Sequence, residues 1–226
     1  MTRLSIVIPT MNEERSIGLV IDEIRKGLPA SLDYEILIVD TDSKDKTRDI
    51  AASKGAKVIS EPRRGYGRAY KTGFERASGE IIATLDADMT YPADRIADLM
   101  GRLDSEKLDF ITTNRFAELQ PGAMRGVHRF GNWILSVTTR LLFRIKLKDS
   151  QSGMWVFRKD ILPKLEVTSD GMSISEELKI EAFRKTKAKE FPIKYSPRIG
   201  EVKLNSWGDG TRNLRFLFSK KLGRAR

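Results

Sequence analysis

Apolar and polar positions alternate between two patterns along the first half of the chain. Short apolar runs with the length and β-branched content of buried strands are separated by stretches in which apolar residues recur at helical spacing. This alternation is typical of βαβ units, so it predicts an α/β fold with a mostly parallel central sheet flanked by helices up to about residue 115. The predicted strands lie within residues 5–9, 34–39 and 80–85.

The second half of the chain is less regular. A Pro-Gly pair at residues 121–122 predicts a loop, and two amphipathic stretches predict helices beyond it. No repeat or long linker divides the sequence, so we expect a single domain over residues 1–226. The expected helices cover residues 17–24, 47–54, 67–77, 93–103, 129–146 and 175–186.

Polar side chains follow each of the three predicted strands at the point where the strand ends. Because the carboxyl ends of parallel strands meet at one edge of a sheet, these side chains are expected in the crevice where open α/β sheets bind nucleotides. Two carboxylates one residue apart, as in the triplet from Asp86 to Asp88, suit a hard divalent cation and, through it, a diphosphate. The strand-end residues are Asn12 and Glu13, Asp40 and Asp42, and Asp86 and Asp88.

Composition narrows the class of partner. The chain has 41 basic and 31 acidic residues among 226, for a net charge of +10, which favours an anionic partner. It has no cysteine and one histidine, which excludes disulfides, thiolate metal sites and histidine clusters. No signal peptide and no apolar run of about 20 residues is visible, so we expect a cytoplasmic protein.

The ordered set of a VIPTxNE opening, a VDxxS second strand and a DAD third strand resembles the family-two inverting glycosyltransferases with a GT-A fold. It looks most like the dolichol-phosphate mannose synthases and related polyprenyl-phosphate hexosyltransferases, and residues 153–159 and 198–204 extend the likeness over nearly the whole chain. The resemblance implies a Rossmann-like sheet with C-terminal amphipathic helices on the acceptor side. Residues 1–115 would bind the nucleotide sugar, and residues 116–226 would face the acceptor and the membrane.

The same resemblance implies roles at the donor site. Asp88 is the expected metal ligand, and Asp86 either supports it or contacts the ribose and metal-bound water. Glu177, with Glu176 as a close rival, resembles an acidic residue that some relatives present from a late helix, and is expected as a further metal ligand. The expected cofactor is Mn²⁺ or Mg²⁺. The residues expected to bind the nucleotide sugar are Pro9, Met11, Asn12, Glu13, Asp40, Asp42, Arg68, Asp86, Ala87, Asp88 and Thr90.

Three of these positions depart from the family pattern. Met11 replaces an aromatic residue, Asp42 carries the acidic side chain usual at position 41, and Thr90 stands where glutamine is frequent. A methionine can still cover a base through its polarizable thioether. The sequence therefore leaves guanine and uracil both open.

On the acceptor side the resemblance points to Arg115, Arg129 and Lys203 as phosphate-binding residues. The planar fork of arginine makes charge-assisted, often bidentate hydrogen bonds to phosphate. Asp88, Arg115 and Arg129 are thus the expected catalytic residues.

The function implied is metal-dependent, inverting transfer of a hexose to a polyprenyl phosphate such as dolichyl phosphate. Mannose from GDP-mannose is the first candidate and glucose from UDP-glucose the second. From another class, a basic non-enzymatic module that binds RNA or an anionic membrane stays open. No nucleic-acid partner is expected, because the acidic strand ends would repel a polyanion unless metal were bound.

The carboxyl-terminal segment, residues 213–226, mixes large apolar with basic side chains. Together with the stretch over residues 129–146, it is expected to lie on a membrane, as a peripheral contact at the cytoplasmic face. The alternative is a helix packed on the domain with a frayed basic end. A membrane-anchoring subunit, or a continuation of the chain into membrane helices, is compatible with both. The three tryptophans, Trp133, Trp155 and Trp207, are expected to be packing residues.

Overall fold

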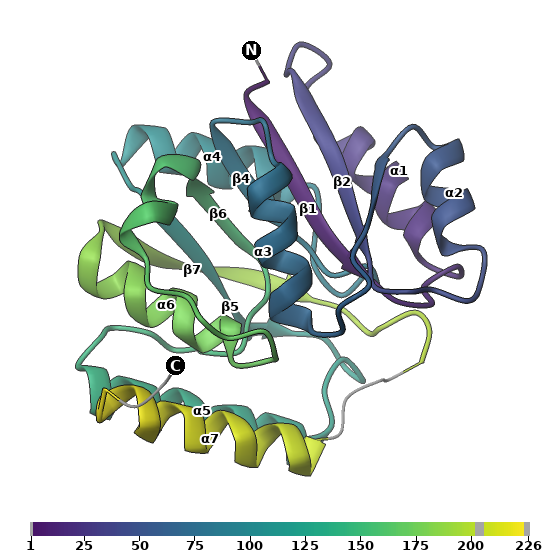
Figure 1. Ribbon diagram of the computed structural model, residues 1–226. Helices are drawn as coiled ribbons and strands as arrows, with labels where there is room; N and C mark the ends of the chain where they lie inside the picture. The colour runs from purple at the N-terminus through teal and green to yellow at the C-terminus, as the bar shows by residue number, and fades with distance from the viewer. Residues whose placement is uncertain (1, 202–205, 224–226) are drawn as a thin grey trace.

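The computed structural model describes residues 2–201 and 206–223. Its centre is a seven-stranded sheet with the order β3-β2-β1-β4-β6-β5-β7 (Figure 1). Only β6 is antiparallel to its neighbours β4 and β5, so the predicted mostly parallel sheet is confirmed. The strands are β1 (Leu4–Thr10), β2 (Tyr34–Asp40), β3 (Lys57–Ser60), β4 (Ile81–Thr84), β5 (Phe110–Leu119), β6 (Trp155–Arg158) and β7 (Ala188–Tyr195).

The helices lie close to their predicted positions. A short 3₁₀ helix, Lys159–Lys164, follows β6, and the carboxyl-terminal segment contributes a seventh α-helix that packs against the domain. The α-helices are α1 (Ile17–Gly27), α2 (Thr47–Ser53), α3 (Tyr66–Arg76), α4 (Arg95–Ser105), α5 (Gly126–Phe143), α6 (Ile174–Lys185) and α7 (Ser206–Lys221).

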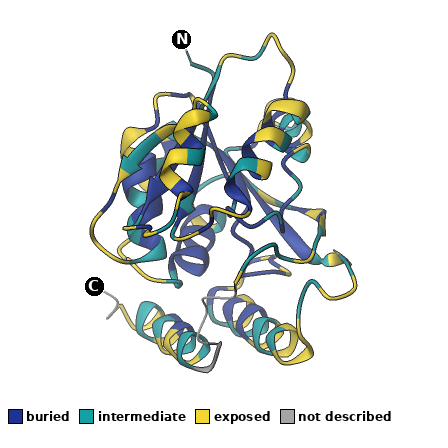
Figure 2. Ribbon diagram, turned by 90° about the vertical axis from the view of Figure 1, so that its right-hand side faces the viewer, coloured by how far each residue is buried: buried dark blue, intermediate teal, exposed yellow. Residues whose placement is uncertain are grey.

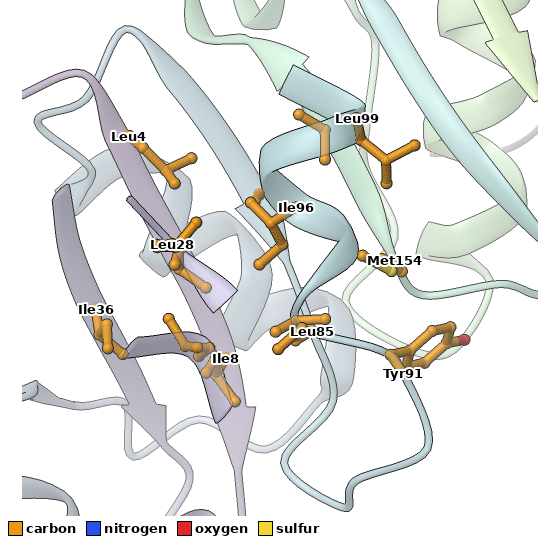
Figure 3. Close-up of a cluster of buried hydrophobic side chains, with 14 of the residues drawn as sticks. Leu4, Ile8, Leu28, Ile36, Leu85, Tyr91, Ile96, Leu99 and Met154 are labelled. Atoms are coloured by element: carbon orange, nitrogen blue, oxygen red, sulfur yellow. The ribbon is translucent and has the colours of Figure 1, made fainter. Parts of the chain in front are cut away.

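Two hydrophobic clusters cover the two faces of the sheet. Successive side chains of a strand point to opposite faces, and β1 shows this directly. Leu4, Ile6 and Ile8 join the cluster that contains α1 and α4 (Figure 3), whereas Val7 joins the cluster that contains α3 and α6. Trp155 is fully buried in the second cluster, as predicted.

A third layer consists of α5 and α7, which lie side by side beyond the sheet (Figure 1). Leu135 and Phe143 of α5, Leu217 of α7 and Ile180 of α6 share a small buried cluster that fastens this layer. Both helices nevertheless keep many exposed residues (Figure 2). Within residues 2–201 and 206–223, no helix has the length and apolar content needed to cross a membrane.

The two edge strands differ from the central ones. β3 has only four residues. β7 carries an exposed proline, Pro192, between exposed Lys189 and Lys194. Proline lacks the amide N–H needed to continue a ladder, and lysine disfavours the approach of another strand.

Candidate active site

The carboxyl ends of β2, β1 and β4 lie next to one another, because these strands are neighbours in the sheet. Each is followed by a loop with a non-glycine residue in the left-handed region: Asn12 (φ 54°), Asp42 (φ 66°) and Met89 (φ 65°). Such backbone is sparsely populated, and it collects at sites where a loop is held for function. The three predicted polar strand ends are thus brought to one edge of the sheet, the donor edge.

Hydrogen bonds tie the first two loops together. The buried Asp40 accepts from the Ser43 amide at 3.0 Å and from the Thr10 hydroxyl at 3.1 Å. The amide of Asn12 donates to the Ser43 hydroxyl at 2.8 Å, and its side-chain oxygen accepts from the Lys44 amide at 2.7 Å. The loops after β1 and β2 therefore form one rigid unit before any ligand binds.

Asp86 lies at the floor of the donor edge. Its Oδ1 accepts a hydrogen bond from the Tyr66 hydroxyl at 2.6 Å. Burial and the negative charge of Asp88 raise the pKa of Asp86 to about 7, while Tyr66, Arg198 and Arg115 act in the opposite direction. The negative charge of Asp86 is unfavourable in this environment, so a cation bound beside it would stabilise the carboxylate.

Gly153 makes room for this contact. A Cβ atom on Gly153 would lie 2.6 Å from the Tyr66 hydroxyl and 3.4 Å from Asp86 Oδ1. Only glycine fits here without moving Tyr66.

Asp88 is buried and fixed from two sides. Its Oδ1 accepts from the amide of Thr90 at 3.1 Å and from the Thr90 hydroxyl at 2.6 Å. Its Oδ2 lies 3.1 Å from Nη1 of Arg198, which also donates through Nη2 to Glu13. Thr90, at the position where glutamine is frequent, therefore orients Asp88.

The donor set fits a hard divalent cation, since Asp86 and Asp88 present carboxylate oxygens from one short loop. Among residues 2–201 and 206–223, no group of three acidic, histidine or cysteine side chains is arranged to hold a metal. Magnesium and manganese are often held by one or two carboxylates together with substrate phosphates. These two aspartates with a diphosphate meet that requirement.

The other residues predicted for the nucleotide sugar lie around this edge or support it. Pro9 pairs with Val39 in the ladder between β1 and β2, and Ala87 is packed in the core below the loop. Met11 is half-buried and Asp42 is exposed, with Lys44 2.6 Å from its carboxylate. Arg68 forms an ion pair with Asp170, at 2.8 Å. These placements leave the base contacts as predictions.

Arg115, predicted to bind the acceptor phosphate, lies in β5 and forms a buried ion pair. Its Nε and Nη2 donate to Asp149 at 2.7 and 2.9 Å. Burial acts to raise the pKa of Asp149, but the charge and hydrogen bonds of Arg115 outweigh it, and the pKa lies below its ordinary value. Nη1 has no hydrogen-bond partner among the described residues. The Arg115 guanidinium is therefore rigid, with one nitrogen left for a ligand.

A largely apolar cavity of about 360 Å³ opens above Arg115, between α5 and α7. Gln151 also lines it, and its side-chain amide donates to Glu176 at 2.6 Å and accepts from Asn213 of α7 at 3.1 Å. We call it the interhelix cavity. The other residues that line it are Val127, His128, Phe130, Gly131, Asn132, Ile134, Leu135, Met172, Asp209, Gly210, Thr211 and Leu214.

The other two residues predicted to bind the acceptor phosphate are Arg129 and Lys203. Arg129 is exposed and lines a separate hollow of about 550 Å³ with Asn114 and Trp133, so the structure does not bring it into the cavity of Arg115. Lys203 lies outside the described residues. Trp133 is 54% exposed, so its predicted packing role is wrong, and the side chain of Trp207 is not among those described.

Glu177, predicted as a further metal ligand, is hydrogen-bonded to a loop and to α7. Its carboxylate is buried and accepts from the amides of Thr168 and Ser169 at 3.0 and 2.8 Å and from Lys220 of α7 at 3.1 Å. It joins no metal-binding group with the two aspartates. Its rival Glu176 is the one that points toward the interhelix cavity, through Gln151. Adjacent residues of a helix point about 100° apart, so Glu176 and Glu177 have different neighbours. Glu177 lies on the side of α6 that binds a loop and α7.

Sequence reasoning missed three residues of the site: Tyr66, Asp149 and Arg198. Tyr66 stands between two glycines that suggest a dinucleotide loop, which obscures its role as a hydrogen-bond donor to Asp86. Asp149 begins a DSQSG run four residues before Gly153, a signal that could have paired it with a nearby arginine. Arg198 lies inside a segment noted only for its resemblance.

Comparisons with known proteins agree with this geometry. Residues 5–166 match the family model for glycosyl transferase family 2. The chain is 37% identical over 217 residues to the low-salt glycan biosynthesis hexosyltransferase Agl6 of Haloferax volcanii, covering 95% of this chain and 52% of that protein. It is 31% identical over 210 residues to a dolichyl-phosphate hexose transferase of the same organism, covering 92% of this chain and 89% of that protein. The chain thus spans about half the length of Agl6 and nearly all of the second relative.

Solved structures show the same fold. Glucosyl-3-phosphoglycerate synthase from Mycobacterium tuberculosis, in complex with UDP, superposes with a TM-score of 0.79 at 22% identity, covering 98% of this chain and 80% of that one. The same synthase has been solved with Mn²⁺ and UDP, at a TM-score of 0.76 and 21% identity. The GT-A fold expected from the sequence is therefore confirmed. Since the family model covers most of the sequence, the chain belongs to glycosyltransferase family 2.

Proposed function

We propose that this protein transfers a hexose from a nucleotide sugar to a polyprenyl phosphate at the cytoplasmic face of a membrane, with GDP-mannose as the first candidate donor. The interhelix cavity carries the proposal, because it joins an apolar space to the buried guanidinium of Arg115. The names of relatives give independent support: one is a dolichyl-phosphate hexose transferase, and another, from Pyrococcus furiosus and 28% identical, is a dolichol-phosphate mannosyltransferase.

The cavity suits a lipid phosphate in both size and chemistry. At about 360 Å³ it falls within the range of small-ligand sites. Phe130, Ile134 and Leu135 supply apolar surface for isoprene units, and Arg115 supplies a charge-assisted donor for the phosphate. Because Asp149 holds the fork of Arg115 in place, the phosphate would meet a pre-oriented partner.

The donor edge would hold the other substrate. A divalent cation bound there would neutralise the charge that builds up on the departing diphosphate. Asp86 and Asp88 would hold it, with Thr90 and Tyr66 fixing their orientation. Burial and Asp88 raise the pKa of Asp86, and the positive charge of Arg115 is among the groups that partly offset this rise, so a phosphate at Arg115 would lie within electrostatic reach of the donor.

The chemistry needs little more from the protein. A phosphate monoester has a second pKa of about 6, so near neutral pH it is largely ionised and can attack without a general base. One in-line displacement at the anomeric carbon breaks the bond to the nucleoside diphosphate and inverts the configuration. The residues of this chain would then act by position and charge, with the arginine on the nucleophile and the aspartates on the leaving-group side.

Exposed apolar side chains on α5 and α7, three of which also line the interhelix cavity, support a membrane location. Among the described residues, all but one of the exposed large apolar side chains lie on these helices or directly after α7, the exception being Leu19. Arg140 and Arg144 flank this surface, which we call the outer apolar face. An apolar helix face with basic neighbours is typical of helices that lie in a membrane interface. The residues of the outer apolar face are Val127, Phe130, Trp133, Ile134, Leu141, Phe218 and Leu222.

A donor and acceptor panel tests the proposal. GDP-mannose, UDP-glucose and UDP-GlcNAc would each be incubated with dolichyl phosphate, or with 3-phosphoglycerate as a soluble acceptor, in the presence of Mn²⁺ or Mg²⁺. We expect transfer to the lipid phosphate, fastest from GDP-mannose. A faster reaction with UDP-glucose would replace GDP-mannose as the proposed donor and leave the proposed acceptor unchanged. Transfer to the soluble phosphate alone would contradict the proposal.

A further inference from the structure

A cation of the protein's own already lies among the carboxylates of the donor edge. Arg198 follows β7, and its guanidinium reaches between the loops after β1 and β4. Nη1 lies 3.1 Å from Asp88 Oδ2, and Nη2 donates to Glu13 Oε1. The side chains of Glu13 and Asp88 are 8% and 6% exposed, so the three groups form a largely buried ion cluster.

The backbone around Arg198 is fixed to the loop that carries Asp88. The amide of Ile199 donates to the carbonyl of Asp88 at 2.9 Å, and the amide of Ser196 donates to the carbonyl of Thr90 at 3.0 Å. The position of the arginine is thus set by its own segment and by the metal-binding loop together. Its contact with Asp88 is therefore a consequence of the backbone arrangement and not a chance contact of a surface side chain.

The hydrogen-bonding capacity of Arg198 is only partly used. Its Nε is buried and has no hydrogen-bond partner among the described residues. A buried donor without a partner is unfavourable, and the guanidinium fork matches the geometry of phosphate oxygens. The two carboxylates therefore satisfy the charge of the arginine but not all of its donors.

We propose that Arg198 is the counter-ion of the ligand-free donor site and exchanges Asp88 for the diphosphate when metal and nucleotide bind together. The inference rests on the proposed metal-dependent donor site and adds the regulation of that site. A metal ion arriving alone must break the buried ion pair of Arg198 with Asp88 and leave the arginine with the charge of Glu13 only, which is costly. A metal ion arriving with a diphosphate offers the guanidinium a new anion.

Metal and nucleotide should therefore bind cooperatively, and the coupling should depend on Arg198. Reciprocity requires each ligand to raise the affinity of the other by the same factor. Coupling of this kind commonly amounts to ~10-fold or more. The exchange also gives Arg198 a role as a positioning residue for the diphosphate.

Mn²⁺ binding to the full chain, followed by electron paramagnetic resonance without and with GDP or UDP, tests the exchange. Wild type should bind Mn²⁺ weakly alone and ~10-fold more tightly with the nucleotide. Arg198→Gln should bind Mn²⁺ alone more tightly than wild type, because the competing charge is gone, yet gain little from the nucleotide. Arg198→Lys should keep the weak binding of Mn²⁺ alone and lose part of the gain, because it retains the charge without the fork.

Arg102→Gln is the matched control, since Arg102 pairs with Asp98 on the exposed side of α4. It should bind both ligands like wild type. Equal Mn²⁺ affinity and equal coupling in wild type and Arg198→Gln, with thermal denaturation showing both folded, would overturn the proposal. If that result is found while wild type still binds the nucleotide, only the proposal for Arg198 fails and the proposed function is unaffected. If wild type binds no nucleoside diphosphate with Mn²⁺, both the proposal for Arg198 and the proposed function are contradicted.

Discussion

The donor edge and the layer of α5 and α7 are built on different principles. At the donor edge, polar groups from three adjacent loops hold one another, as Asp40 holds Ser43 and Thr90 holds Asp88. In the helical layer, a few buried apolar side chains fasten two helices whose outer apolar face stays exposed. The first region gathers charged and polar groups, whereas the second exposes apolar side chains. The comparison teaches that the proposed chemistry and the proposed membrane contact belong to separate parts of this chain.

The substitution Asp88→Asn is the most direct test of the donor edge. The substitution keeps the shape but removes the charge that would hold a divalent cation, and such a cation supplies several kcal/mol of stabilisation to the leaving group. We expect transfer to fall by at least ~10²-fold, while thermal stability changes little. Removal of metal by EDTA should have the same effect on wild type.

Asp98→Asn is the control for that experiment, because Asp98 is exposed on α4 and pairs only with neighbouring arginines. It should retain wild-type transfer. Full activity of Asp88→Asn, or of wild type verified to be free of metal, would show that the donor edge works without a cation.

The junction between the two regions is tested by Asp149→Asn. This change leaves Arg115 as a buried cation without its carboxylate, and breaking a buried ion pair costs about 3–5 kcal/mol. Urea denaturation at pH 7 should report that loss of unfolding free energy. The exposed pair of Arg95 and Asp98 provides the contrast, since Arg95→Gln should cost at most about 1 kcal/mol. Equal losses for both variants would mean that Arg115 is not held as the structure indicates.

The helical layer is tested by Leu141→Asn, which lies on the outer apolar face and is 74% exposed. An exposed substitution should change stability by no more than about 0.5 kcal/mol. If Leu141 enters a bilayer, losing its apolar surface should weaken binding to anionic vesicles by ~10-fold. Leu19→Asn is the matched control, because Leu19 is 48% exposed on α1. Cosedimentation that falls equally for both variants would remove the outer apolar face as the membrane contact.

The smallest expected effect concerns the rim of the donor edge. The Arg63 guanidinium and the Thr72 hydroxyl lower the pKa of Glu61 to about 2, against the burial that opposes them. Because the folded pKa lies below the unfolded value of 4.5, the stabilisation is fully present above pH 4.5 and is lost as the pH falls toward 2.

Glu61→Gln should therefore lower the unfolding free energy by about 1 kcal/mol at pH 7, and the difference from wild type should shrink steadily below pH 4.5. Urea titrations at several pH values measure it, with the exposed Glu75→Gln as control. A pH-independent difference would assign the effect to packing and not to the charge.

Much of this architecture could be predicted from sequence, because the signals are local. A strand followed by a polar pair is contained within about ten residues, and the helical spacing after it decides which face is buried. The sheet, the helices and the meeting of Asp40, Asp86 and Asp88 at one edge follow from that. The prediction of Trp133 as a packing residue was wrong because its helix exposes apolar side chains, against the usual rule.

The rest depends on contacts between distant segments. Arg115 and Asp149 are 34 residues apart, and Arg198 reaches Glu13 across 185 residues. No periodicity reports such pairs. The choice between Glu176 and Glu177 likewise depends on what packs against each side of α6, and α7 provides that partner from the end of the chain.

The two ends of the sheet have a consequence for how copies of the protein behave when crowded. Unpaired strand edges are templates for another chain, and a bound membrane would concentrate molecules in two dimensions. β3 offers only four residues for such pairing, and β7 interrupts its ladder at Pro192 between two lysines. On the membrane proposed here, neighbouring copies would therefore meet at sheet edges that disfavour pairing between molecules.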